Sequence, residues 1–315
     1  MGRARGSNAE MALVFESTYG TTPDSGFFRT PFTSADIGPS QGQIADETLG
    51  LGRDPQAPTL DVVEVGGSVD VPMDLNNTGR WLKALLGAPT TSGAGPYTHV
   101  YTSGATAALP SLSVEMGFPE VPYFEMIEGI KVGSWAVNMA RGQGQNLTGR
   151  FEMTGKGYTG DTTTNAGTPT EMAIERFSHF QGGVSRDDTA LADVISCNFT
   201  YSNGLDPLNV IAPDGEIGGI DEGVASLTGQ MVVRFSSTAL ITQAAAGTAM
   251  DLDLSWTIAS GKSLAVAIPR VFIDRPRIGI SGPGGVDVTY SFTAAQLANG
   301  DPMMTATLIN STESY

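Results

Sequence analysis

The stretch GGSVDVPMDLNNTGRWLKALLG, residues 66–87, reads as a β-strand followed at once by a short helix. Apolar and polar side chains alternate along its first part and just before it, which is the pattern of a strand with one face in the core and one in solvent. The core face carries Val65, Val69, Val71 and Met73, and the solvent face carries Glu64, Ser68, Asp70 and Asp74.

The second part of the stretch predicts a helix over 77–86. Asn76 or Asn77 can cap this helix, because either side chain can accept a hydrogen bond from a free backbone N–H of the first turn. Gly87 stands where helices end in the left-handed conformation. Two pairs of apolar residues four positions apart share one side of the helix, Trp81 with Leu85 and Leu82 with Leu86.

The same strand-and-helix pattern recurs in residues 223–247, GVASLTGQMVVRFSSTALITQAAAG. Ser236 or Ser237 supplies the predicted cap, and Gly247 closes the helix. The core face of this second strand carries Leu227, Met231, Val233 and Phe235.

The segments that follow the two copies also run in parallel. Residues 97–117 match 252–269, and each copy then ends in a glycine-rich turn and an alternating strand, at 142–157 and at 282–294. A gene duplication is the simplest explanation. Chance similarity between β-rich segments is the alternative.

The composition indicates many short strands joined by tight turns, because 315 residues include 40 glycines and 18 prolines with few long helical patterns. The length suits about two domains. We therefore expect a mainly β protein of two tandem β-sandwich or barrel modules, each with one short flanking α-helix. Further strands are predicted near 59–73, 98–103, 111–116, 130–139, 145–154, 192–202, 224–235, 250–258, 263–268 and 286–293.

The order of these patterns divides the chain into four parts. We expect an N-terminal arm at 1–50, a first module at 51–157, a linker and entry strand at 158–190, and a second module at 191–315. Within the first module, PEVPYFEMIEG (119–129) holds three acids and two prolines, which predicts an exposed loop.

The formal net charge of −16 argues against a protein that grips nucleic acid, because such binding depends on Lys and Arg displacing counterions. It leaves open a surface past which DNA slides. The lone cysteine, Cys197, excludes an intrachain disulfide framework and is expected to be a buried small hydrophobe. We find no secretory or transmembrane pattern and expect folding in a reducing cytoplasm.

The sequence offers little for catalysis. The two histidines, His99 and His179, have no cysteine or acid at metal-ligand spacing and are expected to be structural. No G-x-S-x-G nucleophile elbow appears. We therefore expect no catalytic residues, no metal and no cofactor, and hence no enzyme.

The acids on the predicted strands are the remaining candidates for a site. A glycosidic acid/base pair needs one carboxyl in an apolar setting that raises its pKa, whereas these acids occupy the solvent side of alternating strands. A solvated acidic face is favoured, and along a channel it would repel DNA phosphates. The candidate lumen-facing acids are Glu64, Asp70, Asp74, Asp251 and Asp253.

With these residues in view, the chain resembles the tail tube (major tail) proteins of long, non-contractile-tailed bacteriophages. The resemblance lies in element order and turn chemistry and covers most of the chain. Its stretches are ESTYGTTPD (16–24), GRDP (52–55), VGGSVDVPMDLNNTGRWLKALLGAP (65–89), YSNGLDP (201–207) and GPGGVDVTYSFTA (282–294).

The resemblance implies a structural virion protein. One sheet of each β-sandwich or barrel unit would join its neighbours in a ring around a lumen, and rings would stack through a long loop and the N-terminal arm. Two units per chain would make a trimer with pseudo-sixfold symmetry, and a hexamer is the alternative. The implied partners are further copies of the chain, the tape measure, tail terminator and distal tail proteins, and double-stranded DNA that passes without specific binding, with no membrane. Assembly would occur in the host cytoplasm.

Stacking surfaces should be loops with aromatic side chains. We expect intersubunit contacts in 17–50 and in the 117–129 loop, with Phe27, Phe28, Tyr123 and Phe124 as the candidate residues.

Two other functions compete with this one. An outer-membrane-type β-barrel pore fits the length and acidity, but not the missing signal peptide, the 8% aromatic content or the two helices. A carbohydrate-binding or depolymerising tail protein would need clustered exposed Trp and Tyr near paired acids, whereas all three tryptophans lie within patterned elements.

Overall fold

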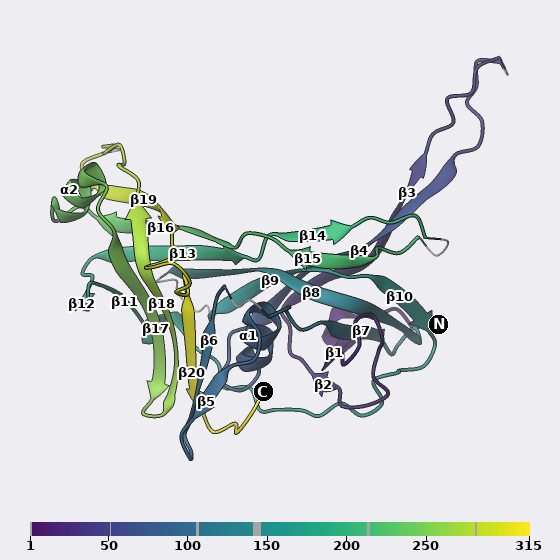
Figure 1. The fold of residues 1–315 in the computed structure, drawn as a ribbon, viewed down its shortest axis with the longest axis horizontal. Helices are drawn as coiled ribbons and strands as arrows, with labels where there is room; N and C mark the ends of the chain where they lie inside the picture. The colour runs from purple at the N-terminus through teal and green to yellow at the C-terminus, as the bar shows by residue number, and fades with distance from the viewer. Residues whose placement is uncertain (1, 51, 105–106, 141–145, 213–214, 281) are drawn as a thin grey trace.

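The computed structural model of the chain describes residues 2–50, 52–104, 107–140, 146–212, 215–280 and 282–315. The described chain is mainly β, as predicted, with large antiparallel sheets that do not close into a barrel and two α-helices (Figure 1). Most of the glycine-rich turn expected after residue 141 lies outside the described residues.

The predicted strands and helices are confirmed, and most boundaries differ by a few residues. The strand predicted near 130–139 is longer and begins at Tyr123. The elements of the N-terminal half are η1 (Gly6–Asn8), β1 (Glu10–Phe15), β2 (Phe28–Arg29), β3 (Ser34–Ile44), β4 (Thr59–Pro72), α1 (Thr78–Leu86), β5 (Thr90–Ser92), β6 (Tyr97–Thr102), β7 (Leu112–Phe118), β8 (Tyr123–Ala140), β9 (Thr148–Thr154) and β10 (Gly157–Asp161). The C-terminal half contains η2 (His179–Gln181), β11 (Gly182–Arg186), β12 (Thr189–Ala190), β13 (Val194–Ser202), β14 (Leu205–Leu208), β15 (Gly219–Glu222), β16 (Ser226–Arg234), α2 (Ala239–Ala246), β17 (Met250–Ala259), β18 (Lys262–Ile273), β19 (Asp287–Ala294) and β20 (Thr305–Asn310).

One long antiparallel sheet runs through both halves, and we call it the long sheet. Its strands follow the order β3–β4–β9–β8–β13–β16–β19. The two halves join where residues 134–140 of β8 pair with 196–202 of β13. Continuous ladder hydrogen bonding therefore connects them directly.

A second sheet has the order β12–β11–β17–β18–β20–β6–β5. It also mixes the halves, because β6 from the N-terminal half pairs with β20 near the end of the chain. The last residues of β18 pair with β19, so β18 takes part in both sheets.

Two smaller β arrangements complete the fold. The first part of β8 lies in a small sheet of order β2–β1–β7–β8–β10. Strands β14 and β15 form a separate two-stranded ribbon. Lys131 on β8 holds this ribbon, because its Nζ donates to the Ile220 carbonyl at 2.8 Å and pairs with Glu222 at 2.5 Å.

The two sequence copies have different pairing partners after their helices. In the C-terminal copy β17 and β18 are adjacent antiparallel strands. In the N-terminal copy β6 pairs with β5 and β20, while β7 pairs with β1 and β8. The segments 97–117 and 252–269, which match in sequence, thus occupy different places in the sheets.

The core faces predicted from the alternation are confirmed, apart from one residue. Phe235 follows the last residue of β16 and is 37% exposed. The other seven residues are buried, namely Val65, Val69, Val71, Met73, Leu227, Met231 and Val233.

A row of buried aromatic rings links the helix α1 to both halves of the long sheet. Trp81 of α1 stacks on Phe151 of β9 with ring centroids 4.9 Å apart, and Phe151 stacks on Trp135 of β8 at 6.0 Å. Trp135 meets Phe199 of β13 edge-on at 5.0 Å. Such pairs add to the stabilisation from apolar burial, and the row makes one core of the two halves.

The two helices differ in how far the fold covers them. Helix α1 is buried on nearly every side, including both predicted i,i+4 pairs, whereas α2 buries only Leu240. Gly247 closes α2 in the predicted left-handed conformation, and Ser237 Oγ accepts from the Ala239 N–H at 3.2 Å. Gly87 closes α1 with its N–H donating to the Lys83 carbonyl, at a positive φ of 92°.

The exposed loop predicted over 119–129 is wrong for most of its length. Only residues 119–122 form a turn, and β8 begins at Tyr123 and continues for 18 residues. Three acids misled the prediction. Glu120 lies in the turn, whereas Glu125 and Glu128 lie on β8 and accept hydrogen bonds from the hydroxyls of Tyr123 and Thr22. Met126 and Ile127 between them are buried.

The long axis of the molecule runs from α2 and β19 at one end to the β3–β4 hairpin at the other (Figure 1). The hairpin extends well beyond the rest of the protein, which we call the body. Neither α-helix of the described chain has the length and apolarity to cross a membrane.

Candidate assembly surfaces

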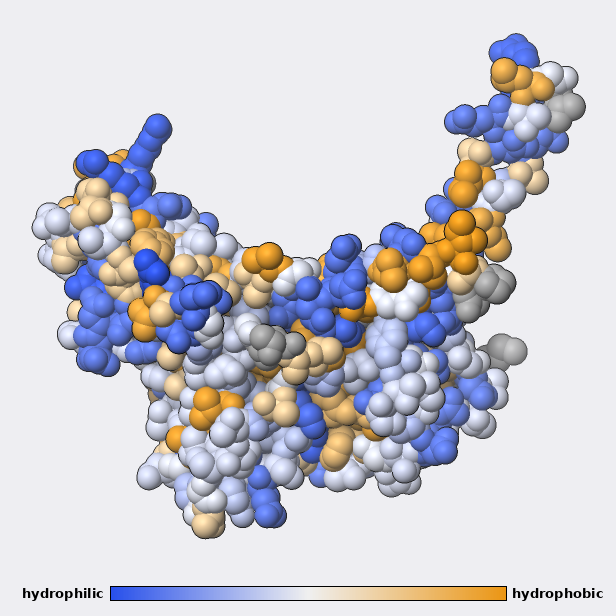
Figure 2. Space-filling model, in the orientation of Figure 1, coloured by the Kyte–Doolittle hydropathy of each residue, from blue (hydrophilic) through white to orange (hydrophobic). Residues whose placement is uncertain are grey.

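The β3–β4 hairpin forms a two-stranded arm in which residues 34–44 pair with 59–70. Figure 2 shows apolar residues gathered along this arm and at its base. Exposed apolar side chains on a projecting element indicate contact with another protein. Among the described residues of the arm, the large exposed ones are Ile44 (52% exposed), Leu49 (93%), Leu60 (66%) and Val62 (62%).

The long sheet has an incompletely paired strand at each end. Among the described residues β3 pairs with β4 alone. At the other end, β19 pairs with β16 throughout, but only its last three residues pair with β18. Unpaired strand edges are templates for pairing with another chain.

The face of the long sheet that points away from the aromatic core carries rows of small polar side chains. One row crosses four strands through the paired residues Asn138, Asn198, Gln230 and Ser291. A second row runs through Ser68, Glu152, Ser134, Ser202 and Ser226. This face is hydrophilic, and its charged groups include Glu152 in the second row and Arg150 on the same strand.

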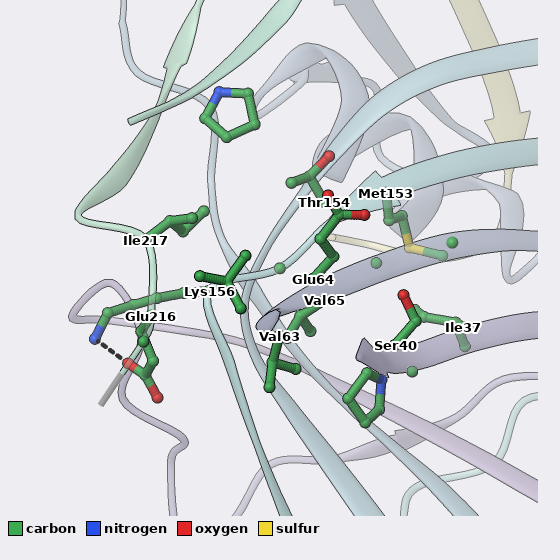
Figure 3. Close-up of a pocket in the computed structure, with 18 of the residues that line it drawn as sticks. Ile37, Ser40, Val63, Glu64, Val65, Met153, Thr154, Lys156, Glu216 and Ile217 are labelled. Carbon is green, nitrogen blue, oxygen red and sulfur yellow. Dashed lines mark ion pairs between the residues drawn. The ribbon is translucent and has the colours of Figure 1, made fainter. Parts of the chain in front are cut away.

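A groove of about 1150 Å³ lies between the base of the arm and the β14–β15 ribbon. Figure 3 shows Ile37 and Ser40 of β3, Val63 to Val65 of β4, and Ile217 from the ribbon's connecting loop lining it. Lys156 and Glu216 form an ion pair at 3.1 Å on one side. Among the described lining residues Lys156 is the only base, against the acids Asp36, Glu64, Glu125 and Glu216.

Two of the predicted lumen-facing acids lie on the solvent side of β4, as the alternation requires. Glu64 is exposed and lines the groove. Asp70 is half-buried, accepts from Ser34 Oγ at 2.5 Å and lies 3.7 Å from Arg150 Nη1. Both carboxylates therefore keep contact with solvent.

A third predicted acid, Asp74, is buried and so cannot face a lumen, which corrects the prediction. β4 ends at Pro72, so the alternation no longer applies two residues later. Asp74 instead holds the start of α1, where its Oδ1 accepts from the backbone N–H groups of Asn76 and Asn77, each at 2.9 Å. The side-chain cap predicted for an asparagine is thus replaced by this carboxylate.

Replacing Asp74 with alanine should destabilise the protein by about 2 kcal/mol, because buried N–H groups at the helix start lose their acceptor. Asp74→Asn keeps an oxygen acceptor and should cost less than half as much. Equilibrium urea denaturation at pH 7 measures both values. Equal losses for the two variants would contradict the capping role.

The stability difference between the wild type and Asp74→Asn should change with pH in a defined direction. Burial raises the pKa of Asp74 above its ordinary 3.8, outweighing the hydrogen bonds that lower it. Relative to Asp74→Asn, the wild type is therefore most stable below about pH 4 and loses that advantage as the pH rises through the folded-state pKa. A stability difference between the two proteins that stays constant from pH 3 to pH 7 would contradict this assignment.

The other two predicted acids, Asp251 and Asp253, lie on β17 in the second sheet, apart from those on β4. They converge with Asp188, and ligand oxygens of the three carboxylates lie within 4.8 Å of one another. Burial raises the pKa of Asp253, and the charges of Asp251 and Asp188 raise it further. Asp188 is not among the predicted acids, because it lies between β11 and β12 and comes near β17 only through tertiary pairing.

The four aromatic residues predicted to make intersubunit contacts are mostly engaged within the chain. Phe27 is buried in a small cluster with Val14 and Met126, so it is not an exposed contact residue and that prediction is corrected. The Phe28 ring lies 3.8 Å from the Arg80 guanidinium carbon.

The remaining two aromatic residues begin β8. Phe124 is half-buried on this strand, beside Gly117 of β7. Tyr123 is 42% exposed at the rim of the groove, where its hydroxyl donates to Glu125 at 2.9 Å. Tyr123 is therefore the most accessible of the four.

The histidine and cysteine predictions agree with the structure where it bears on them. His99 is fully buried between Thr91 Oγ1 and the Thr312 carbonyl, each 2.9 Å from a ring nitrogen. Cys197 is buried, which raises its pKa to about 12 and keeps the thiol unreactive at neutral pH.

Comparison with known proteins places the chain in a family. A model of the family described as phage tail tube protein matches residues 6–294 of the chain. That match spans every element from η1 to β19. No curated protein matches the sequence.

Proposed function

The chain belongs to the phage tail tube protein family and is a structural component of the virion tail, and from this premise we propose that its copies close into rings that stack into a hollow tube. Double-stranded DNA would pass through this tube on its way to the host. The tape measure, tail terminator and distal tail proteins would be its neighbours in the tail.

The long sheet carries this proposal. It spans both halves, presents rows of small polar side chains on its open face, and has incompletely paired strands at its two ends. Joining the β3 end of one copy to the β19 end of the next would satisfy these edges and close a ring. The polar face would then border the lumen.

A lumen wall of this kind suits DNA that must pass through the tube without binding to it. Most of its groups are small and uncharged and offer few cations to hold phosphates, and Asp70 on β4 would repel them. For Asp251 and Asp253 the same role requires that the second sheet also border the lumen. The family is a structural one, and we propose that the protein catalyses no reaction.

The number of chains per ring follows from how many tube units each chain supplies. A strand followed by a helix occurs once in each half, at β4–α1 and at β16–α2, and both strands belong to the long sheet. We therefore propose a gene duplication and three chains per ring, with six chains as the alternative. The β3–β4 arm would reach the adjacent ring.

Purified protein over a concentration series tests the proposed function. We expect sedimentation to shift from single chains to large particles and negative-stain microscopy to show hollow tubes of uniform width. Single chains at every concentration, with no rings or tubes under any ionic condition tried, would contradict the proposal. So would cleavage of a polysaccharide by the purified chain.

A further inference from the structure

The segment Arg275-Pro276-Arg277-Ile278-Gly279-Ile280 leaves the end of β18 without forming regular secondary structure. Both arginines are exposed, and neither forms an ion pair with another described residue. Ile278 is 45% exposed and Ile280 is 79% exposed. The described contacts of the isolated chain do not explain why two unpaired arginines lie beside two exposed isoleucines. We call residues 275–280 the basic segment.

The basic segment lies at the end of the long sheet that has the open β19 edge. The Asp274 N–H, just before it, donates to the Ser291 carbonyl of β19 at 2.8 Å. From Arg275 onward the chain leaves β19, because Pro276 lacks the N–H that a continued ladder needs. The basic segment therefore begins beside the incompletely paired strand β19.

The groove at the opposite end of the molecule has the complementary chemistry. Asp36 and Glu64 are exposed on its β3 and β4 walls, and its one described base, Lys156, is already paired with Glu216. Ile37, Val63 and Val65 supply apolar surface between these acids (Figure 3). The groove can therefore accept a short segment that carries both positive charge and apolar side chains.

We propose that the basic segment of one copy docks into the groove of the next copy and fixes the joint between neighbouring chains in the ring. This rests on the proposed function and names the surfaces that close the ring. Arg275 and Arg277 would face Asp36 and Glu64, while Ile278 and Ile280 would cover the apolar floor. The groove and the segment lie at opposite ends of one chain (Figure 1), so the contact forms between chains.

DNA phosphate is the other partner that two arginines could hold. The structure favours a second copy, because phosphate contacts leave Ile278 and Ile280 in water, whereas the groove removes both kinds of group from solvent together.

Charge reversal tests the docking. Arg275→Glu with Arg277→Glu, or Asp36→Lys with Glu64→Lys, should each raise the concentration for half-maximal assembly at least ~30-fold, because like charges then face each other at the joint. The fourfold variant that exchanges the charges should recover most of the lost assembly. Asp301→Lys with Glu313→Lys matches the second variant in net charge and should assemble like the wild type. Circular dichroism verifies that each variant is folded.

A disulfide gives a readout that does not depend on charge. Cysteines placed at Ser40 and Ile280 should produce a ladder of covalent multimers when assembled protein is oxidised, whereas the pair Leu297→Cys with Ile280→Cys should not. The native Cys197 is buried and does not interfere.

The possible outcomes separate the two proposals. A wild type that never forms rings or tubes overturns the proposed function. A wild type that assembles, with both reversals assembling equally well or with no ladder from the Ser40 and Ile280 cysteines, overturns the docking alone. The docking proposal is also overturned if the fourfold variant does not recover assembly. It is overturned as well if the variant Arg275→Glu with Arg277→Glu assembles normally but retains less DNA.

Discussion

A protein whose β3–β4 arm is shortened is expected to fold normally and to lose tube assembly. Residues 42–62 can be removed and replaced by Asn-Gly, because Gln41 and Val63 are directly paired and a two-residue Asn-Gly turn suits the twist of a hairpin. The described residues of the deleted part include four large exposed apolar side chains, Ile44, Leu49, Leu60 and Val62.

The expected loss is large because, under the proposed stacking, the exposed apolar side chains of the arm would make contacts that form only between rings. Burying one leucine contributes about 2 kcal/mol, so the contacts of Leu49 and Leu60 alone amount to about 4 kcal/mol. That corresponds to a roughly 1000-fold higher concentration for assembly. Sedimentation of the shortened and full-length proteins side by side measures the change.

A matched variant separates the reach of the arm from its apolar contacts. Leu49→Ser with Leu60→Ser keeps the hairpin length and should weaken assembly less than the deletion does. If the shortened protein forms tubes at the wild-type concentration, the arm has no part in stacking, and that half of the proposal fails.

The second large effect concerns the core that joins the two halves. Trp135 is fully buried and contacts Phe151 on β9 and Phe199 on β13. Trp135→Ala should lower the free energy of unfolding by about 3–5 kcal/mol, because it removes a large buried ring and leaves a cavity where the halves meet. Trp135→Phe keeps an aromatic ring there and should cost about half as much.

Chemical denaturation followed by far-ultraviolet circular dichroism measures these losses. Because one core spans both halves, both proteins should unfold in a single transition, with the alanine variant at lower denaturant. A loss below about 1 kcal/mol, or two separate transitions in the wild type, would contradict a shared core.

Local patterns were sufficient to predict most of the elements. Local spacing indicates which face is buried, as it does for Val65, Val69 and Val71 and for the i,i+4 pairs of α1. Burial is the property that the sequence encodes most directly. The prediction was wrong where a strand continues through polar residues, as in β8, where Glu128 accepts from Thr22, a partner that only the tertiary fold brings near. It was also wrong for Asp74, which follows the end of β4 and is buried at the start of α1.

The assembly surfaces could be predicted only in part. The acids on β4 follow from alternation, but the meeting of Asp188 with Asp251 and Asp253 depends on the pairing of β11 with β17. Likewise, the basic segment and the groove are far apart in sequence and at opposite ends of the fold, so no local pattern connects them. The sheet join at β8 and β13 is also a long-range pairing that composition and periodicity do not specify.

The central claim is that the long sheet of each chain closes with its neighbours into a wall around a lumen. A cryo-electron microscopy map of assembled protein tests it most directly. The account predicts a hollow tube in which three chains per ring turn the row Asn138, Asn198, Gln230 and Ser291 toward the lumen, with the β3 end of each chain against the β19 end of the next. A tube whose lumen is bordered by another surface, with both sheet ends exposed to solvent, would contradict it.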